Sequence, residues 1–290
     1  MTRRGWVLFA AMSVIWGIPY LLIKVVVGEM SPITLVFLRT GLATAILLPL
    51  ALARGRLRGV IPHWRPILVY TFVEVAAPWV LLSHAETRLS SSLSGLLVAG
   101  VPLVTAVITR LSGGDDRLDA RRVLGLVIGL FGVAVLVGLD VAADDLVAVG
   151  ELGLVVLGYS VGALLISRRL ADVSAEGVIV ASLALTALAY APFALTRLPG
   201  APLPANALLA LGLLAVICTA LAFRVFFALI AEVGASRATV ITYFNPAVAL
   251  ILGVALLGEP FTVGIAVGFA LILLGSVLAT RRVPAAIVPR

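Results

Sequence analysis

The sequence predicts an all-helical membrane protein with ten transmembrane helices arranged as two inverted repeats of five. Three observations lead to this prediction: an apolar composition, apolar runs of bilayer length, and a residue pattern that recurs halfway along the chain. Of the 290 residues, 62% are apolar and 12% are charged, whereas about 25% are charged in an average soluble domain. This ratio excludes a disordered or fibrous protein and argues against a water-soluble globule.

Ten segments are long enough to cross a bilayer, because about 20 helical residues span its hydrocarbon core. They are continuously apolar and do not alternate at period two, which indicates helices and not barrel strands. The first segment has no convincing cleavage site, and we interpret it as an uncleaved helix. The predicted spans are Gly5–Val27, Pro32–Ala53, Pro66–Thr87, Ser90–Leu111, Arg122–Leu139, Gly150–Ser167, Glu176–Thr196, Asn206–Ile230, Arg237–Leu257 and Phe261–Thr280.

The basic residues fall in alternate loops, and this distribution predicts the orientation of the helices. If the amino terminus is cytoplasmic, sixteen basic residues lie in inside segments, and only Arg88 and Arg197 lie in outside loops. We therefore expect a multi-pass protein of the cytoplasmic (inner) membrane with both termini in the cytoplasm. The net charge of +7 follows from this bias and does not indicate nucleic-acid binding.

The two halves of the chain repeat one pattern of proline and glycine. Pro102 and Pro246 are 144 residues apart, and so are Gly114 and Gly258. The pattern divides the chain into residues 1–140 and 141–290. Each half holds five helices, and an odd number of helices makes the second half enter the membrane upside down, as in many secondary transporters.

The order of these motifs resembles the EamA-type transporters of the drug/metabolite transporter superfamily over essentially the whole chain. The matching motifs are Trp16-Gly17, Ser31-Pro32, Leu38-Arg39, Asn245-Pro246 and Gly258-Glu259-Pro260. The first repeat departs from the pattern, because Gly114-Asp115-Asp116 stands where the second has Gly258-Glu259. The resemblance implies ten helices, cytoplasmic termini and export of small metabolites, often amino acids or amphipathic drugs.

Glu74 is the clearest candidate for a transport residue, because a charge deep in a span is costly and usually functional. Tyr70 and Pro78 lie on the same helix face. We predict a cavity-lining carboxylate that binds a substrate amine or a proton; a structural ion pair is the alternative. Arg224 lies at a similar predicted depth in the equivalent helix and is the expected partner of Glu74, unless it extends to the headgroups.

Two further helices carry polar and aromatic side chains along one face. In the first span these are Ser13, Trp16, Tyr20 and Lys24, and Pro19 is predicted either to kink the helix or to leave a carbonyl as a hydrogen-bond site. In the ninth span they are Thr239, Thr242, Tyr243 and Pro246, and Asn245 adds an amide that lipid would leave unsatisfied. An interfacial aromatic belt is the alternative interpretation of the first stripe. Tyr159 and Ser160 in the sixth span are weaker candidates.

Some residues are assigned other roles. Arg39 is predicted to form a structural pair or to extend outward, with binding of an anionic substrate as the alternative. His84 and Glu86 are expected to face the loop. Small residues such as Gly125, Gly129 and Gly132 are expected to allow close helix contact.

The function predicted from these residues is secondary transport: export of a small metabolite, amino acid or amphipathic drug by alternating access, coupled to a proton gradient through Glu74. The sequence has no phosphate-binding loop of the Walker type, no metal-ligand pattern and no cofactor motif. Expected partners are the lipid bilayer and a small molecule, with a homodimer left open. The alternatives are an intramembrane enzyme and a membrane protein that does not transport. The predicted substrate-binding residues are Ser13, Trp16, Tyr20, Tyr70, Glu74, Tyr159, Arg224, Thr242, Tyr243 and Asn245.

Overall fold

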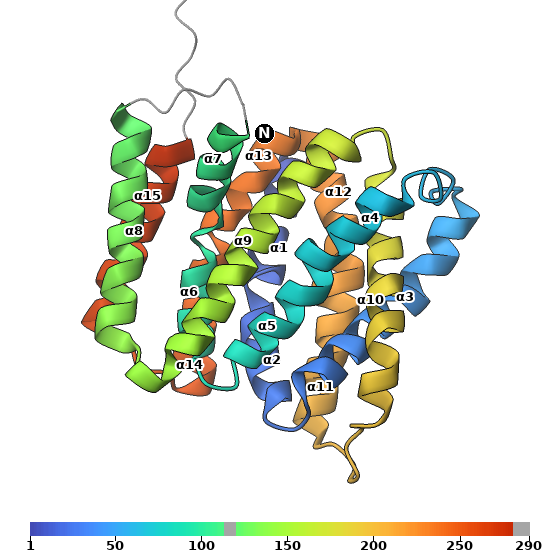
Figure 1. Cartoon of the computed structure of the whole chain (residues 1–290), viewed down its shortest axis with the longest axis horizontal. Coiled ribbons are helices and arrows are strands. Elements are labelled where there is room, and N and C mark those ends of the chain that lie inside the picture. The colour runs from blue at the N-terminus through green and yellow to red at the C-terminus, as the bar shows by residue number, and fades with distance from the viewer. Residues whose placement is uncertain (113–119, 281–290) are drawn as a thin grey trace, which may run out of the picture.

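The computed structural model describes residues 1–112 and 120–280, and within these ranges the chain is a bundle of helices without strands (Figure 1). Ten of its helical spans are long and apolar enough to cross a membrane, which confirms the predicted fold class. The elements are α1 (Arg3–Ile15), α2 (Ile18–Val27), α3 (Pro32–Ala53), α4 (Trp64–Tyr70), η1 (Thr71–Ala76), α5 (Ala77–Ala85), α6 (Ser91–Val98), α7 (Val101–Leu111), α8 (Ala120–Asp140), η2 (Ala143–Asp145), α9 (Leu146–Arg169), α10 (Ala175–Leu195), α11 (Ala205–Ala215), η3 (Val216–Leu221), α12 (Ala222–Val233), α13 (Ala235–Ala238), η4 (Thr239–Tyr243), α14 (Asn245–Leu257) and α15 (Val263–Thr280).

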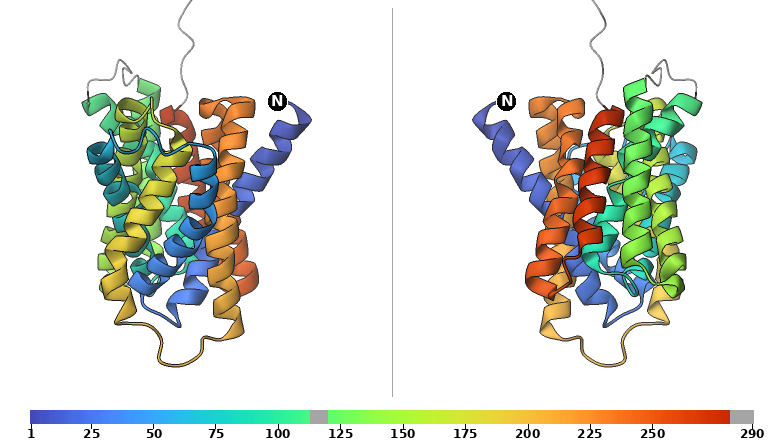
Figure 2. Two further views of the ribbon diagram at one scale, coloured as in Figure 1. Left: turned by 90° about the vertical axis from the view of Figure 1, so that its right-hand side faces the viewer. Right: turned by 90° about the vertical axis from the view of Figure 1, so that its left-hand side faces the viewer.

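The spans run up and down between two ends of the bundle. The end that carries the amino terminus and the loops 54–63 and 170–174 is called the proximal end below. The opposite end carries the loops 28–31, 86–90, 196–204 and 258–262, and is called the distal end. Figure 2 shows α1 inclined against the remaining helices, which stand more nearly parallel.

Several spans are interrupted, and the interruptions follow the repeat. In the first half, the fourth span breaks between α6 and α7, and Pro102 lies in the first turn of α7. In the second half, the ninth span changes from the 3-10 segment η4 to α14, and Pro246 lies in the first turn of α14. The predicted kink of the first span is a break at Trp16-Gly17, after which Pro19 lies in the first turn of α2.

The third and eighth spans, which are equivalent in the two repeats, each contain a π-helical segment of six residues. These segments are η1, which contains Glu74, and η3, which contains Cys218 and Thr219. Single π-helical turns are rare and occur frequently at functional sites. Gly114, Asp115 and Asp116, where the first repeat departs from the second, lie outside the described residues.

The last helices of the two halves, α8 and α15, pack along each other with their backbones in close contact (Figure 1). A side chain at Gly125 would meet the Ala279 backbone nitrogen, and one at Gly132 would meet the Ile272 backbone nitrogen. Leu103 of α7 fills the space over Gly129. The prediction that these glycines allow close helix contact is confirmed.

Substitution of Gly275 by alanine should destabilise the fold. The added methyl group would collide with the backbone of Gly125 and Gly129, and overpacking of this kind typically costs about 1–3 kcal/mol. Thermal unfolding of detergent-purified protein measures the loss. Gly138→Ala is the matched control, because a methyl group there meets no atom within 4 Å. Equal melting temperatures for the two variants would contradict this account of the contact.

Candidate functional site

Buried and partly buried polar side chains from six parts of the chain gather in the middle of the bundle and toward its distal end. Tyr20 comes from α2, Arg39 from α3 and Tyr159 from α9, while the third span and the turn after it contribute the largest share. We call this set the polar cluster. Its members are Tyr20, Arg39, Tyr70, Glu74, Trp79, Glu86, Tyr159 and Thr219.

Arg39 is the buried cation of the cluster, with 6% of its surface exposed. Its guanidinium carbon lies 3.8 Å from the centroid of the Trp79 ring, and its Nε donates a hydrogen bond of 2.9 Å to Thr219 Oγ1. Stacking on an aromatic face and a fixed acceptor compensate part of the cost of burying the charge. Of the two roles predicted for Arg39, the structure has the structural pairing, and the side chain is held inside the bundle and does not extend outward.

Glu74 projects from η1 toward α9. Its Oε2 is buried and has no hydrogen-bond partner, and it lies so close to Gly162 that any side chain there would collide with it. Tyr70 and Tyr159 lie within electrostatic range of the carboxyl group. Tyr159 is also within electrostatic range of Arg39, which connects the acidic and basic members of the cluster.

Arg224 lies apart from this cluster. Its side chain is exposed on α12, and in residues 1–112 and 120–280 no ion pair joins it to Glu74. The predicted Glu74–Arg224 pair is therefore wrong. The prediction compared only the depths of the two residues along their helices, and depth does not determine which way a side chain points around the helix axis.

Ser13 and Asn245 meet at a helix junction near the break in the first span. With its amide oriented to satisfy its hydrogen bonds, Asn245 donates to the main-chain oxygens of Ser13 at 3.1 Å and Ile241 at 3.0 Å. The Ser13 hydroxyl donates to Phe9 O at 2.9 Å. Gly17 packs directly against Val248 and the Asn245 carbonyl. These contacts join α1 to the start of α14.

The remaining predicted residues face other parts of the bundle. Trp16 packs on the rings of Phe223 and Phe226, with centroid distances of 5.9 and 4.6 Å. The Tyr243 hydroxyl is hydrogen-bonded to α15, to Thr280 and more weakly to the Ser276 carbonyl. Thr242 donates to the carbonyl of Thr239 in its own turn. The candidate residues are thus divided among several environments.

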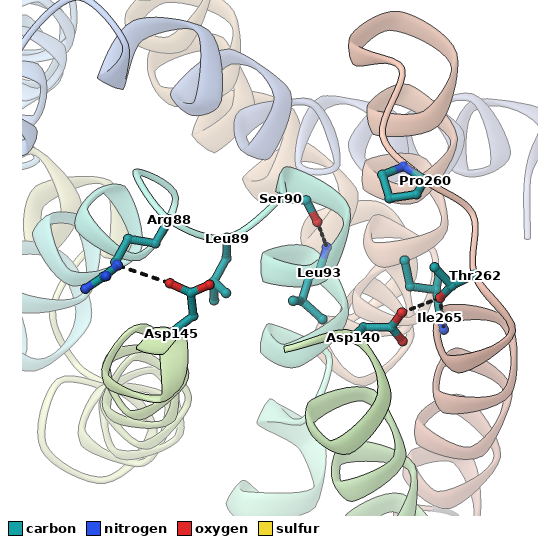
Figure 3. A pocket seen from close by; sticks show the side chains of 9 residues that line it. All are labelled: Arg88, Leu89, Ser90, Leu93, Asp140, Asp145, Pro260, Thr262 and Ile265. Carbon is teal, nitrogen blue, oxygen red and sulfur yellow. Dashed lines mark hydrogen bonds and ion pairs between the residues drawn. The ribbon is translucent and has the colours of Figure 1, made fainter. Parts of the chain in front are cut away.

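Both hollows described in the structure open at the distal end, and neither is lined by a predicted substrate-binding residue. The hollow in Figure 3 has a volume of about 160 Å³, and Arg88 pairs with Asp145 at 3.1 Å on one side of it. On the other side, Thr262 donates a 2.5 Å hydrogen bond to Asp140 (Figure 3). The second hollow, of about 250 Å³, is lined in part by the hydrogen-bonded pair of His84 and Glu151.

Glu86 and His84 differ, although both were expected to face the loop. His84 is half exposed at the distal end. Glu86 is fully buried, so the expectation for Glu86 is wrong. Glu86 directly follows α5, in the turn that leads to α6. Lys24 of α2 donates hydrogen bonds to the main chain of this turn.

Trp79, Thr219 and Glu259 were not among the predicted site residues, although Trp79 and Thr219 contact Arg39. Glu259 accepts hydrogen bonds from the backbone nitrogens of Ser91 (2.7 Å) and Ser92 (2.9 Å) at the start of α6. The recurring Gly-acid motif at Gly258-Glu259 was a signal for this residue, but its partner lies 167 residues away in the chain. No regular spacing along the sequence links two residues that are so far apart in the chain.

Ten membrane-length helices in residues 1–112 and 120–280, with a cluster of charged and aromatic side chains between them, define a multi-pass integral membrane protein. The EamA-like transporter family matches the chain twice, over residues 3–138 and 151–281. The chain belongs to this family.

The relatives of the chain include proteins named as transporters, and a solved structure shares its fold. The chain is 24% identical to the uncharacterized transporter YoaV of Bacillus subtilis (strain 168), over 93% of this chain and 94% of that protein. It is 28% identical to the uncharacterized inner membrane transporter YedA of Escherichia coli (strain K12), over 86% and 81%. A crystal structure with 23% identity covers 95% of this chain and 96% of its own, with a TM-score of 0.68, and supports the fold.

Replacement of Thr219 by valine should destabilise the protein, because it removes the acceptor of the buried Arg39 guanidinium. A hydrogen bond to a charged group contributes about 1.5–3 kcal/mol. Thr40→Val is the matched control: Thr40 is equally buried, but its hydroxyl bonds only to carbonyls of its own helix. Chemical or thermal unfolding of both variants gives the difference. If the two lose the same stability, the Arg39–Thr219 bond contributes nothing.

Proposed function

We propose that this membrane transporter exports a small metabolite, an amino acid or an amphipathic drug by alternating access, with proton entry as the driving force. The observation that carries the proposal is that Glu74 Oε2 is buried in a membrane span and has no hydrogen-bond partner among the described residues. An ionised carboxylate in this position is costly unless a proton or a cationic group joins it.

The substrate site is proposed at the four predicted residues that meet in the polar cluster: Tyr20, Tyr70, Glu74 and Tyr159. Glu74 would bind the cationic group of the substrate, and the three phenol rings would supply apolar contact with polar tips. Tyr159 lies within electrostatic range of both Glu74 and Arg39. A site with one acidic and one basic side chain suits a zwitterion such as an amino acid, which has both charges.

Coupling is proposed to arise from competition at Glu74. When the site faces the side of higher proton concentration, Glu74 takes up a proton and the cationic substrate leaves. When the site faces the other side, the proton leaves and substrate binds. The two repeats, residues 1–140 and 141–290, would exchange roles between these states.

The orientation proposed from the basic residues places the proximal end in the cytoplasm of the cell and the distal end outside its inner membrane. Arg54, Arg56 and Glu176 form ion pairs at the proximal end, at 3.6 Å each. The acidic residues Asp144 and Asp145 lie at the distal end. An excess of basic residues at the cytoplasmic end is the distribution that sets the topology of polytopic proteins.

Single cysteines in a Cys218→Ser background test this orientation. Asp144→Cys and Gly200→Cys should react with a membrane-impermeant thiol reagent added outside intact cells, because both sites are at the distal end. Arg56→Cys should react only after the membrane is permeabilised. The reverse pattern of labelling would show that the proximal end is outside.

Transport by Glu74→Gln in vesicles tests the coupling. The substrate is first identified by comparing metabolites inside and outside cells with and without the protein. The neutral variant should then lose flux driven by an imposed pH gradient, because an amide cannot take up or release a proton. Exchange of substrate for substrate should survive at raised substrate concentration, because the three tyrosines remain to bind the substrate while the lost charge weakens its affinity. Glu29→Gln, at an exposed carboxyl, is the control and should behave as the parent protein.

Loss of flux alone does not distinguish a coupling residue from a misfolded variant. Replacing one charged residue of a buried polar cluster can strongly destabilise the fold. Surviving exchange shows that the variant is folded. If Glu74→Gln responds to the pH gradient as the parent does, Glu74 is structural and the coupling residue lies elsewhere.

A further inference from the structure

The turn that joins α5 to α6 is held at the distal end by side chains from two other parts of the chain. Lys24 of α2 donates from Nζ to the main-chain oxygens of Glu86 at 2.7 Å and Leu89 at 2.8 Å. Glu259, in the turn after α14, accepts from Ser92 Oγ at 2.5 Å as well as from the first backbone nitrogens of α6. These contacts, called the tethers below, join α2, the turn after α14 and the start of α6. The arrangement in which both tethers are formed is called the distal closure.

Between these two tethers, the Glu86 side chain is completely enclosed. Its residue exposure is 0%, and neither carboxyl oxygen has a hydrogen-bond partner. Burying a carboxylate ion without partners is far more costly than burying the neutral acid. The closed arrangement of the distal end therefore fits a protonated Glu86 and does not fit an ionised one.

The charged and titratable groups that face Glu86 do not change this conclusion. They are Lys24 and Tyr20 from α2, Arg39 from α3, and Glu259 from the turn after α14. Each of the three ions already has its own partners: Lys24 has two carbonyls, Arg39 has Thr219 and the Trp79 ring, and Glu259 has the start of α6. None of the three forms an ion pair with the Glu86 carboxyl in the described residues.

The balance of these effects gives the direction of the pH dependence. Burial raises the pKa of the Glu86 carboxyl well above its ordinary value; Lys24 and Arg39 offset part of the rise, and Glu259 adds to it. A carboxyl whose pKa is higher in the closed arrangement stabilises that arrangement at low pH. The contribution is lost as the pH rises through the closed-state pKa.

We propose that Glu86 is a proton-binding site that controls the distal closure: the closed end holds the neutral acid, and opening to water releases the proton. The proton binds one carboxylate oxygen from the distal solvent and returns to the same solvent, so no charge crosses the membrane. Glu86 therefore senses the pH on the distal side, whereas Glu74 is proposed to carry the transported proton. The inference rests on the alternating access proposed above, but not on the role of Glu74.

Accessibility of a buried distal residue tests the proposal without any substrate. Ser94 of α6 is fully buried below the tethers, and Ser94→Cys in the Cys218→Ser background introduces a thiol of similar size. The purified protein, in vesicles of neutral lipid, is treated with an impermeant thiol reagent between about pH 5 and about pH 9. Rates are divided by those of free cysteine at each pH, which removes the titration of the thiol itself.

The parent should become more accessible as the pH rises, by about tenfold per pH unit below the midpoint, because each unit changes the ionised fraction of one carboxyl by that factor. Glu86→Gln, which imitates the protonated acid, should stay slow at every pH. Glu86→Asp retains a titrating group and should retain the pH dependence with a shifted midpoint, which shows that the site tolerates substitution. Glu29→Gln, at an exposed carboxyl, should resemble the parent.

Two results would overturn the proposal: labelling of the parent that does not change with pH, or a pH dependence that Glu86→Gln shares with the parent. Because the measurement needs no transport, its outcome is independent of the flux experiment on Glu74. A Glu86-dependent labelling profile together with normal gradient-driven flux in Glu74→Gln would uphold the closure and reject the proposed coupling residue.

Discussion

The interruptions of the membrane spans free main-chain carbonyls that lipid cannot satisfy, and the polar side chains of the bundle are placed to bind them. Tyr190 donates to Ala76 O at 3.0 Å at the end of η1, and Ser276 donates to Ala99 O at 3.5 Å in the gap between α6 and α7. Thr219 donates to Leu214 O at 2.7 Å in η3. Lys24 does the same for the turn after α5. These polar side chains thus donate the hydrogen bonds that main-chain carbonyls at the interruptions require.

This requirement explains which predictions from sequence succeeded. The ten spans and the close glycine contact of α8 with α15 depend on composition and spacing along single helices, and the sequence carries both. That Tyr20, Tyr70 and Tyr159 line one substrate site with Glu74 stays a prediction, although Tyr70 and Tyr159 do lie within electrostatic range of this carboxyl group. The Arg224 pairing was wrong because it needed the rotation of two helices, one of them containing the π-helical segment η3, and no local pattern records that rotation.

The burial of Glu86 is a second feature that no local sequence pattern predicts. Its position at the end of a predicted helix suggested a solvated loop, yet the loop is covered by α2 and α6, and the side chain is enclosed. Long-range contacts decide burial at helix ends, where the sequence looks similar whether or not another helix passes over it. For Arg39 the sequence left a structural pairing and an outward position open, because no local pattern identifies an aromatic partner forty residues away such as Trp79.

The packing of α8 against α15 has a geometric consequence for the whole bundle. These helices are the fifth of each repeat, so an operation that exchanges the repeats brings the pair onto itself. Their interlocked backbones, which leave no room for side chains at Gly125, Gly132 and Gly275, allow little sliding or separation. In the alternating access proposed above, we therefore expect α8 and α15 to move as one unit while other spans change position relative to them.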